Sequence, residues 1–223
     1  NHSSAASDVY KRQMMNCGQQ AGKQCASHSE TDAHTFPTVN EEKINGVNFT
    51  APNVQIDKSF MESIKEVNAN WVSLIPYAYS YPGKPEINFD SKFQWWGEKT
   101  DGIIATLKYA KELGYKVMMK PHIWVIGQGW AGEQKMETEE DWQEWEQQNS
   151  RYVLHFAKIG EEHGAEMICI GTEYKIAAVE REQHWRDLIK EVREVFSGKV
   201  TYAANWDNYH NIQFWDELDY IGI

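Results

Sequence analysis

Cys169-Ile170-Gly171-Thr172-Glu173 is a mostly apolar run that ends on a carboxylate. A parallel strand that is covered on both faces reads as a continuous apolar run. In barrels of alternating strands and helices, catalytic residues lie where such strands end, at the C-terminal face. A charged group directly after buried residues is costly unless it is paired or functional. Glu173 is therefore the first candidate for a catalytic carboxylate, and an ion pair with Lys120 or Lys175 is the structural alternative.

Similar short apolar segments recur along the chain and alternate with helical patterns. The expected strands are residues 45–49, 71–76, 116–122, 167–173, 199–206 and 220–223. The expected helices are residues 57–69, 100–113, 138–163 and 183–196, in which apolar residues recur every three or four positions. Trp142 and Trp145 follow this period and are predicted to pack in the core. The alternation predicts an α/β fold with a mostly parallel sheet and right-handed crossovers.

Six strands suit either an open doubly wound sheet or three quarters of a barrel. A dinucleotide-binding sheet has a glycine-rich turn after its first strand, whereas residues 50–53 read Thr-Ala-Pro-Asn. A whole barrel takes about 250 residues, and the segment from Ile44 to Ile223 stops within an apolar run. We therefore expect residues 41–223 to form an incomplete (β/α)8 TIM barrel with about six of its eight strands, in a truncated chain.

Residues 1–40 are rich in Ser, Ala, Gln, Thr and His and show no apolar periodicity, so we expect a disordered leader. Residues 8–13 (DVYKRQ) match the translated end of a sequencing-library adapter, which suggests that part of the leader is an artefact; an ordinary flexible tail is the alternative. Cys17 could be the lipidated cysteine of a bacterial lipoprotein, but Asn16 fits poorly where such signals prefer a small residue, which favours the alternative of a free thiol. An extracytoplasmic location follows from the lipoprotein interpretation.

Composition limits the classes of partner. A formal net charge of -11 argues against nucleic acid, because phosphate binding needs a basic surface. No apolar stretch approaches the roughly 20 residues of a membrane span. The three cysteines show no zinc-binding spacing, and His122 stands alone at a strand end, which disfavours a metal-dependent hydrolase. We expect no metal, no cofactor and a monomeric full-length protein.

The chain has ten tryptophans, and several follow predicted strands. Sugar rings stack on aromatic rings, while their hydroxyl groups need carboxylates, amides and ring nitrogens nearby. The spacing of Lys120, His122 and Trp124 predicts that all three lie on one face of a strand end. The candidate substrate-binding residues are Asn48, Tyr77, Trp96, Lys120, His122, Trp124, Asn205, Trp206 and Asp207. The alternatives are loop anchors for Trp96, Trp124 and Trp206, and a carbonyl hydrogen bond for His122.

Four segments give the chain a family resemblance. They are Gly46-Val47-Asn48-Phe49, the Gly-Thr-Glu ending at Glu173, and residues 201–206 and 218–223. With them the chain resembles clan-A glycoside hydrolases, most closely the family 113 β-mannanase-like barrels. Thr172 departs from the commoner clan pattern, which has Asn before the acid/base, but this departure is shared with family 113.

The resemblance implies a retaining glycosidase for a β-linked polysaccharide or oligosaccharide such as β-mannan. It makes Glu173 the general acid/base at the end of strand four, and it places the nucleophilic Glu at the end of strand seven, beyond Ile223. His122 and Asn205 would orient sugar hydroxyls or the nucleophile. Because the nucleophile would be missing, we expect this chain alone to be inactive.

A carbohydrate-binding barrel without turnover is the alternative function. Such a module would keep Trp96, Trp124 and Trp206 but would need no pair of carboxylates. The sequence beyond residue 223 distinguishes the two, because only the enzyme needs a further strand that ends on a carboxylate.

Overall fold

The structure is a computed structural model, and it describes residues 43–223. The expectations for residues 1–40, including the adapter-like segment 8–13 and the role of Cys17, lie outside the described residues. Within the described part no helix is long and apolar enough to cross a membrane.

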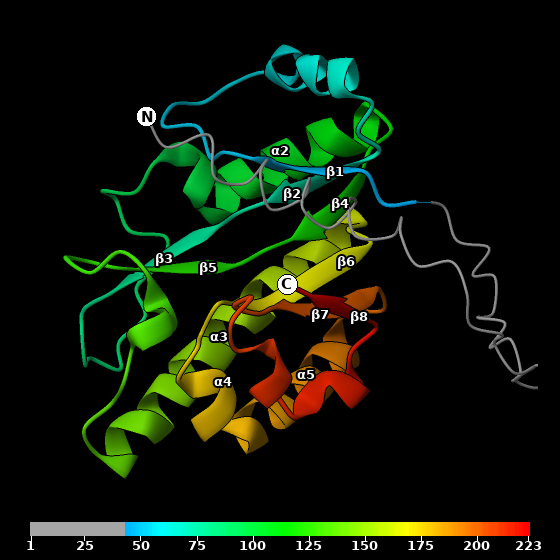
Figure 1. The fold of residues 1–223 in the computed structure, drawn as a ribbon. Helices are drawn as coiled ribbons and strands as arrows, with labels where there is room; N and C mark the ends of the chain where they lie inside the picture. Colours follow the sequence, from blue (N-terminus) through cyan, green and yellow to red (C-terminus); the bar gives the residue numbers. More distant parts are fainter. Residues whose placement is uncertain (1–42) are drawn as a thin grey trace, which may run out of the picture. The chain divides into compact units, whose positions relative to one another are not determined.

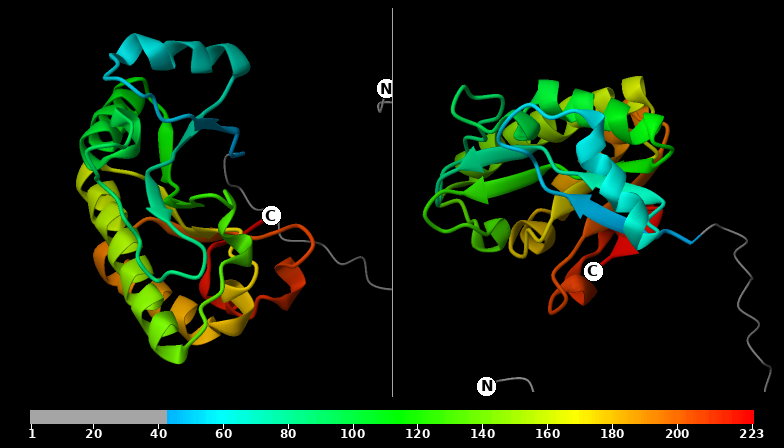
Figure 2. Two further views of the ribbon diagram at one scale, coloured as in Figure 1. Left: turned by 90° about the vertical axis from the view of Figure 1, so that its left-hand side faces the viewer. Right: turned by 90° about the horizontal axis from the view of Figure 1, so that it is seen from above.

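The main sheet has six parallel strands whose spatial order follows the chain. They are β1 (Gly46–Phe49), β2 (Trp71–Leu74), β4 (Lys116–Met119), β6 (Met167–Thr172), β7 (Lys199–Ala203) and β8 (Tyr220–Gly222). A doubly wound sheet reverses its order at a switch point, and this sheet does not. The sheet curls into a half-barrel, with α2, α3 and α5 on its outer face (Figures 1 and 2). The prediction of a partial (β/α)8 barrel is confirmed.

Two strands of the barrel continue into a second sheet that the sequence did not predict. β3 (Tyr77–Ser80) and β5 (His122–Val125) pair in parallel, with Tyr77 opposite His122 and Tyr79 opposite Trp124. Pro76 and Pro121 separate these strands from β2 and β4, because proline has no N–H for a continuous ladder. The predicted strands 71–76 and 116–122 are therefore wrong in extent. His122 begins β5 and does not end a strand of the main sheet.

The helices follow the predicted periodicity. They are α2 (Thr100–Glu112), α3 (Glu139–His163), the short α4 (Ala177–Glu180) and α5 (Glu182–Val195). Thr138 caps α3 by accepting a hydrogen bond from the backbone N–H of Asp141 at 3.1 Å. Gly164, with φ of 78°, ends the same helix.

The predicted helix at 57–69 is present as a 3-10 helix, η1 (Lys58–Val67), and its predicted cap at Asp57 is confirmed. Four shorter 3-10 helices are η2 (Trp96–Glu98), η3 (Ala131–Glu133), η4 (Tyr209–Asn211) and η5 (Phe214–Glu217).

An aromatic cluster packs behind β6 and β7. Trp185 of α5 is fully buried, and its ring is stacked on that of Phe214 with centroids 5.7 Å apart. Its Nε1 donates to the carbonyl oxygen of Ala177 at 3.0 Å, which satisfies the one polar atom of the buried indole. Trp142 and Trp145 are also buried, as predicted. This cluster supports the strand that presents Glu173.

Candidate active site

Glu173 directly follows β6 in a strained backbone conformation. Its φ is 57°, in the left-handed region that residues other than glycine rarely adopt. Its backbone N–H donates to the carbonyl oxygen of Ala203 at 2.8 Å, and its own carbonyl accepts from the N–H of Lys175 at 2.9 Å. Such strain persists only where the surroundings enforce it, and it is concentrated at functional sites.

β7 and the loop after it supply this support. The Tyr202 hydroxyl accepts a hydrogen bond from the backbone N–H of Tyr174 at 3.0 Å. The Asn208 side-chain amide donates to the carbonyl of Lys175 at 3.0 Å. The Lys175 ammonium in turn lies 2.7 Å from Asp207 Oδ2, and this hydrogen bond lowers the pKa of Asp207. The turn at Glu173 is therefore tied to β7 at one point and to the loop after β7 at two.

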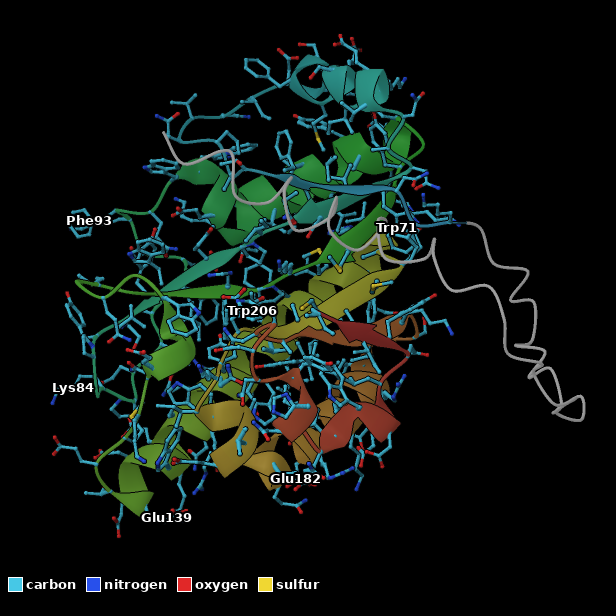
Figure 3. All side chains as sticks on the ribbon, viewed as in Figure 1. Trp71, Lys84, Phe93, Glu139, Glu182 and Trp206 are labelled. Carbon is cyan, nitrogen blue, oxygen red and sulfur yellow. The ribbon has the colours of Figure 1, made fainter. Side chains whose placement is uncertain are left out.

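Asp207 and Trp206, which are neighbours in the sequence, differ in their contacts and exposure. Asp207 is occupied by Lys175, whereas Trp206 is 81% exposed and projects from the loop after β7 (Figure 3). Asn205, by contrast, is buried at the start of that loop, where its carbonyl accepts from the N–H groups of residues 208 and 209.

Glu173 itself forms no ion pair within residues 43–223. The structural alternative, in which it pairs with Lys120 or Lys175, is therefore not what the structure shows. Among the described strands, β6 is also the only one that is directly followed by a carboxylate. The carboxyl group of Glu173 is thus available at the C-terminal end of the sheet.

A cavity of about 310 Å³ lies where β3, β5 and the segment before η2 meet. Its lining residues are Thr50, Ala51, Tyr77, Tyr79, Trp95, Glu98 and Trp124. Tyr77 and Trp124, which the sequence analysis selected separately, are thereby brought together. The His122 ring lies 5.2 Å from that of Tyr77, beside this cavity. Trp95 lines the cavity, while the neighbouring Trp96 does not.

Glu98 is the charged residue of this cavity, and sequence reasoning missed it. Its side chain is only 7% exposed, and it accepts hydrogen bonds from the Tyr79 hydroxyl at 3.1 Å and from the Trp95 N–H at 3.2 Å. Burial, followed by the charge of Glu98, raises the pKa of Tyr79 to about 12. The usual sequence signature for such a bond has Ser or Thr at the cap, and this chain has Trp95 there, so no local pattern marks Glu98.

Asn48 and Lys120 lie elsewhere. Asn48 lines a separate cavity of about 180 Å³ together with Trp71, Ser73 and Met118. Lys120 lies in the break between β4 and β5, close enough for its charge to lower the pKa of His122. No group of three or more His, Cys, Asp or Glu side chains within residues 43–223 is arranged to hold a metal ion.

Two buried histidines predict how stability depends on pH. Burial lowers the pKa of His122 and of His184 to about 4, with Lys120 and Arg181 as the respective second causes. Between about pH 6.5 and pH 4 the unfolded chain binds protons that the folded chain does not. The contribution of these two histidines to stability is therefore complete above about pH 6.5 and is lost as the pH falls towards 4, by about 2–3 kcal/mol for the nearly buried His184.

Thermal melts from pH 7.5 to pH 4 test this expectation. His184→Gln should flatten the pH dependence of the melting temperature, whereas the control His210→Gln, at an exposed position, should leave it steep. An unchanged slope in His184→Gln would show that this histidine titrates normally.

The strained backbone at Glu173 predicts that glycine is more stable than alanine at this position, although neither residue supports activity. A left-handed conformation costs a residue other than glycine about 1–2 kcal/mol. We expect Glu173→Gly to raise the free energy of unfolding by about 1 kcal/mol relative to Glu173→Ala, because alanine keeps the strain. Both variants should lose activity. Urea unfolding of the two variants measures the difference, and equal stabilities would argue against a strained turn.

Known proteins of one family are similar to this chain. The model of Glycoside Hydrolase Family 113 matches residues 49–223. The comparison with curated proteins gave no match.

Among solved structures, a family 113 β-mannanase from Alicyclobacillus acidocaldarius is 30% identical, with a TM-score of 0.75, and the match covers 82% of this chain and 61% of that one. A family 113 β-1,4-mannanase is also 30% identical, with a TM-score of 0.69 and coverage of 81% and 62%. The chain therefore spans about three fifths of the length of these enzymes.

The family match extends over most of the chain and includes β6 and Glu173, which follows it. The two solved structures are 30% identical to this chain over about four fifths of its length. The chain belongs to glycoside hydrolase family 113.

Proposed function

We propose that the protein containing this chain is a retaining glycosidase that hydrolyses β-1,4-linked mannan, with Glu173 as its general acid/base. The observation that carries the proposal is the position of Glu173, held in a left-handed turn at the end of β6 with no ion-pair partner in the described part of the chain. The substrate is suggested by the similar solved structures, which are described as β-mannanases.

The proposed chemistry needs two carboxyl groups. In a retaining glycosidase they lie about 5–5.5 Å apart, one protonating the leaving oxygen and the other attacking the anomeric carbon. Glu173 donates the first proton and later removes one from the water that hydrolyses the glycosyl intermediate. Within residues 43–223 no second carboxylate directly follows a strand, so the proposal assigns no residue of this chain as the nucleophile.

His122, Asn205 and Trp206 have supporting roles in this proposal. His122, whose pKa is lowered to about 4, is neutral at pH 7, so its ring exchanges hydrogen bonds with sugar hydroxyls without adding charge. Asn205 begins the loop whose later residues fix the Glu173 turn, and it orients the substrate or the nucleophile. Trp206, being largely exposed, offers a ring face for a sugar residue.

The test is hydrolysis of β-1,4-mannotetraose by the full-length protein, with the anomeric configuration of the first product followed by NMR. A β-anomer formed before mutarotation supports retention. An α-anomer formed first would show an inverting enzyme and overturn the assigned mechanism. Binding without any hydrolysis would favour the alternative, a carbohydrate-binding barrel. Cellotetraose, which differs at the C2 hydroxyl, serves as the substrate control.

A further inference from the structure

The cavity beside β3 and β5 contains a buried carboxylate that the proposed acid/base chemistry does not use. Glu98 lines this cavity and is 7% exposed, yet it forms no ion pair within residues 43–223. Burying a carboxylate without a cation is costly unless hydrogen-bond donors surround it. Glu98 therefore needs donors, and the structure supplies only some of them.

The donors present leave part of the carboxylate unsatisfied. The Tyr79 hydroxyl donates to the two carboxylate oxygens of Glu98, at 3.1 Å from each. The backbone N–H of Trp95 donates to Oε2 at 3.2 Å. An ionised carboxylate has about four acceptor positions. Oε1 accepts only the Tyr79 hydrogen bond that it shares with Oε2. Glu98 can therefore accept further hydrogen bonds from the hydroxyl groups of a ligand in the cavity.

The rest of the cavity is aromatic. Trp95 and Trp124 are 52% and 47% exposed, and Tyr77 and Tyr79 complete the wall. The cavity volume of about 310 Å³ is at the lower end of the roughly 300–1,000 Å³ of small-molecule sites. Flat rings combined with one acceptor-only group suit a ligand that has apolar C–H faces and hydroxyl donors.

We infer that this cavity is a subsite for a neutral pyranose ring, in which Glu98 accepts hydrogen bonds from sugar hydroxyls while Trp95 and Trp124 pack against the ring. A uronic acid is rejected there, because its carboxylate would face that of Glu98 at short range with no cation between them. The inference rests on the proposed function only in taking this ring to be part of the same β-linked chain that reaches Glu173.

The local structure makes Glu98→Gln a mild substitution. Glutamine keeps an oxygen that accepts from the Trp95 N–H and from Tyr79, so η2 retains its contacts. What is lost is the negative charge and one acceptor. Because a hydrogen bond to a charged group contributes about 1.5–3 kcal/mol, the expected loss of affinity is about tenfold or more.

Calorimetry on the full-length protein tests the inference. Every variant carries Glu173→Gln so that ligand is not consumed, and the probes are β-1,4-mannotetraose and its C6-oxidised counterpart, β-1,4-tetramannuronate. Glu98→Gln should weaken mannotetraose binding about tenfold and narrow its preference over tetramannuronate. The matched control is Glu86→Gln, which removes an exposed carboxylate from the loop after β3 and should change neither affinity.

Two results would overturn the subsite: unchanged mannotetraose affinity in Glu98→Gln, or equal affinity of the parent for the two probes. If Glu98→Gln fails to fold, Trp95→Ala removes only a half-exposed ring and should weaken mannotetraose by a similar factor. A third result would separate the two proposals. If the Glu173→Gln protein binds mannotetraose and Glu98→Gln weakens that binding, while the protein with native Glu173 hydrolyses nothing, the proposed function is overturned and the subsite stands.

Discussion

We expect the replacement of Glu173 with glutamine to lower the turnover of β-1,4-mannan by about 10²–10⁴, the usual contribution of general acid–base catalysis. Glutamine has nearly the same shape but cannot give a proton to the leaving oxygen. The backbone bonds to Ala203 and Lys175 do not involve the side chain, so the turn is preserved. Release of reducing ends from mannan measures the effect, and Glu137→Gln, at an exposed position, is the control.

A substrate with an activated leaving group separates acid catalysis from a structural effect. A dinitrophenyl β-mannoside needs little protonation, so Glu173→Gln should release dinitrophenol in a burst and then stall at the glycosyl-enzyme. Azide should restore turnover and yield a β-glycosyl azide, because it attacks without a general base. Equal losses on mannan and on the activated substrate, without rescue by azide, would contradict the assignment of Glu173 as the acid/base.

Replacing Trp185 with alanine should destabilise the protein by about 3–5 kcal/mol, the range for truncating a large buried aromatic residue. The indole is fully buried, packs on Phe214 and Tyr202, and donates its N–H to the carbonyl of Ala177. Alanine leaves a cavity and removes the indole hydrogen bond to Ala177, whose carbonyl still accepts from the backbone N–H of Arg181. Since natural domains are stable by about 5–15 kcal/mol, this loss is a large share of the total.

Urea unfolding of the full-length protein measures the loss. Trp206→Ala is the matched control, because that ring is 81% exposed and its removal should change stability by no more than about 0.5 kcal/mol. A Trp185→Ala variant as stable as the control would mean that the aromatic cluster repacks without a cavity. Its residual activity at low temperature would then report whether β6 still presents Glu173 correctly.

Local patterns were sufficient to predict the main elements. The three- and four-residue spacing of Ile103, Leu107 and Ala110 marks the buried face of α2, and Thr138 and Gly164 mark the ends of α3. Strand order was predictable because strands and helices alternate and no nucleotide-binding turn follows β1. Glu173 was found for the same reason, as the carboxylate that ends a buried strand.

Other features depend on contacts between distant segments and could not be read from local patterns. The ladder of β3 and β5 resumes beyond Pro76 and Pro121, and only the pairing of the two strands reveals it. Glu98 follows two tryptophans in a polar segment, and its burial arises when Tyr79 closes over it. Asn48 lies in a short strand with a sequence pattern like that of the other strands, but it lines a different cavity.

The pairing of β3 with β5 also has a consequence for how specificity can change. Side chains that alternate along paired strands form a grid with spacings of about 4.8 Å between strands and about 7 Å along them. Tyr77, Tyr79, His122 and Trp124 occupy four points of this grid, and the backbone hydrogen bonds beneath them do not depend on which side chains they carry. The paired strands therefore hold these four side chains in fixed positions. In the proposed subsite, a single replacement can change a contact with the sugar while the backbone around it stays the same.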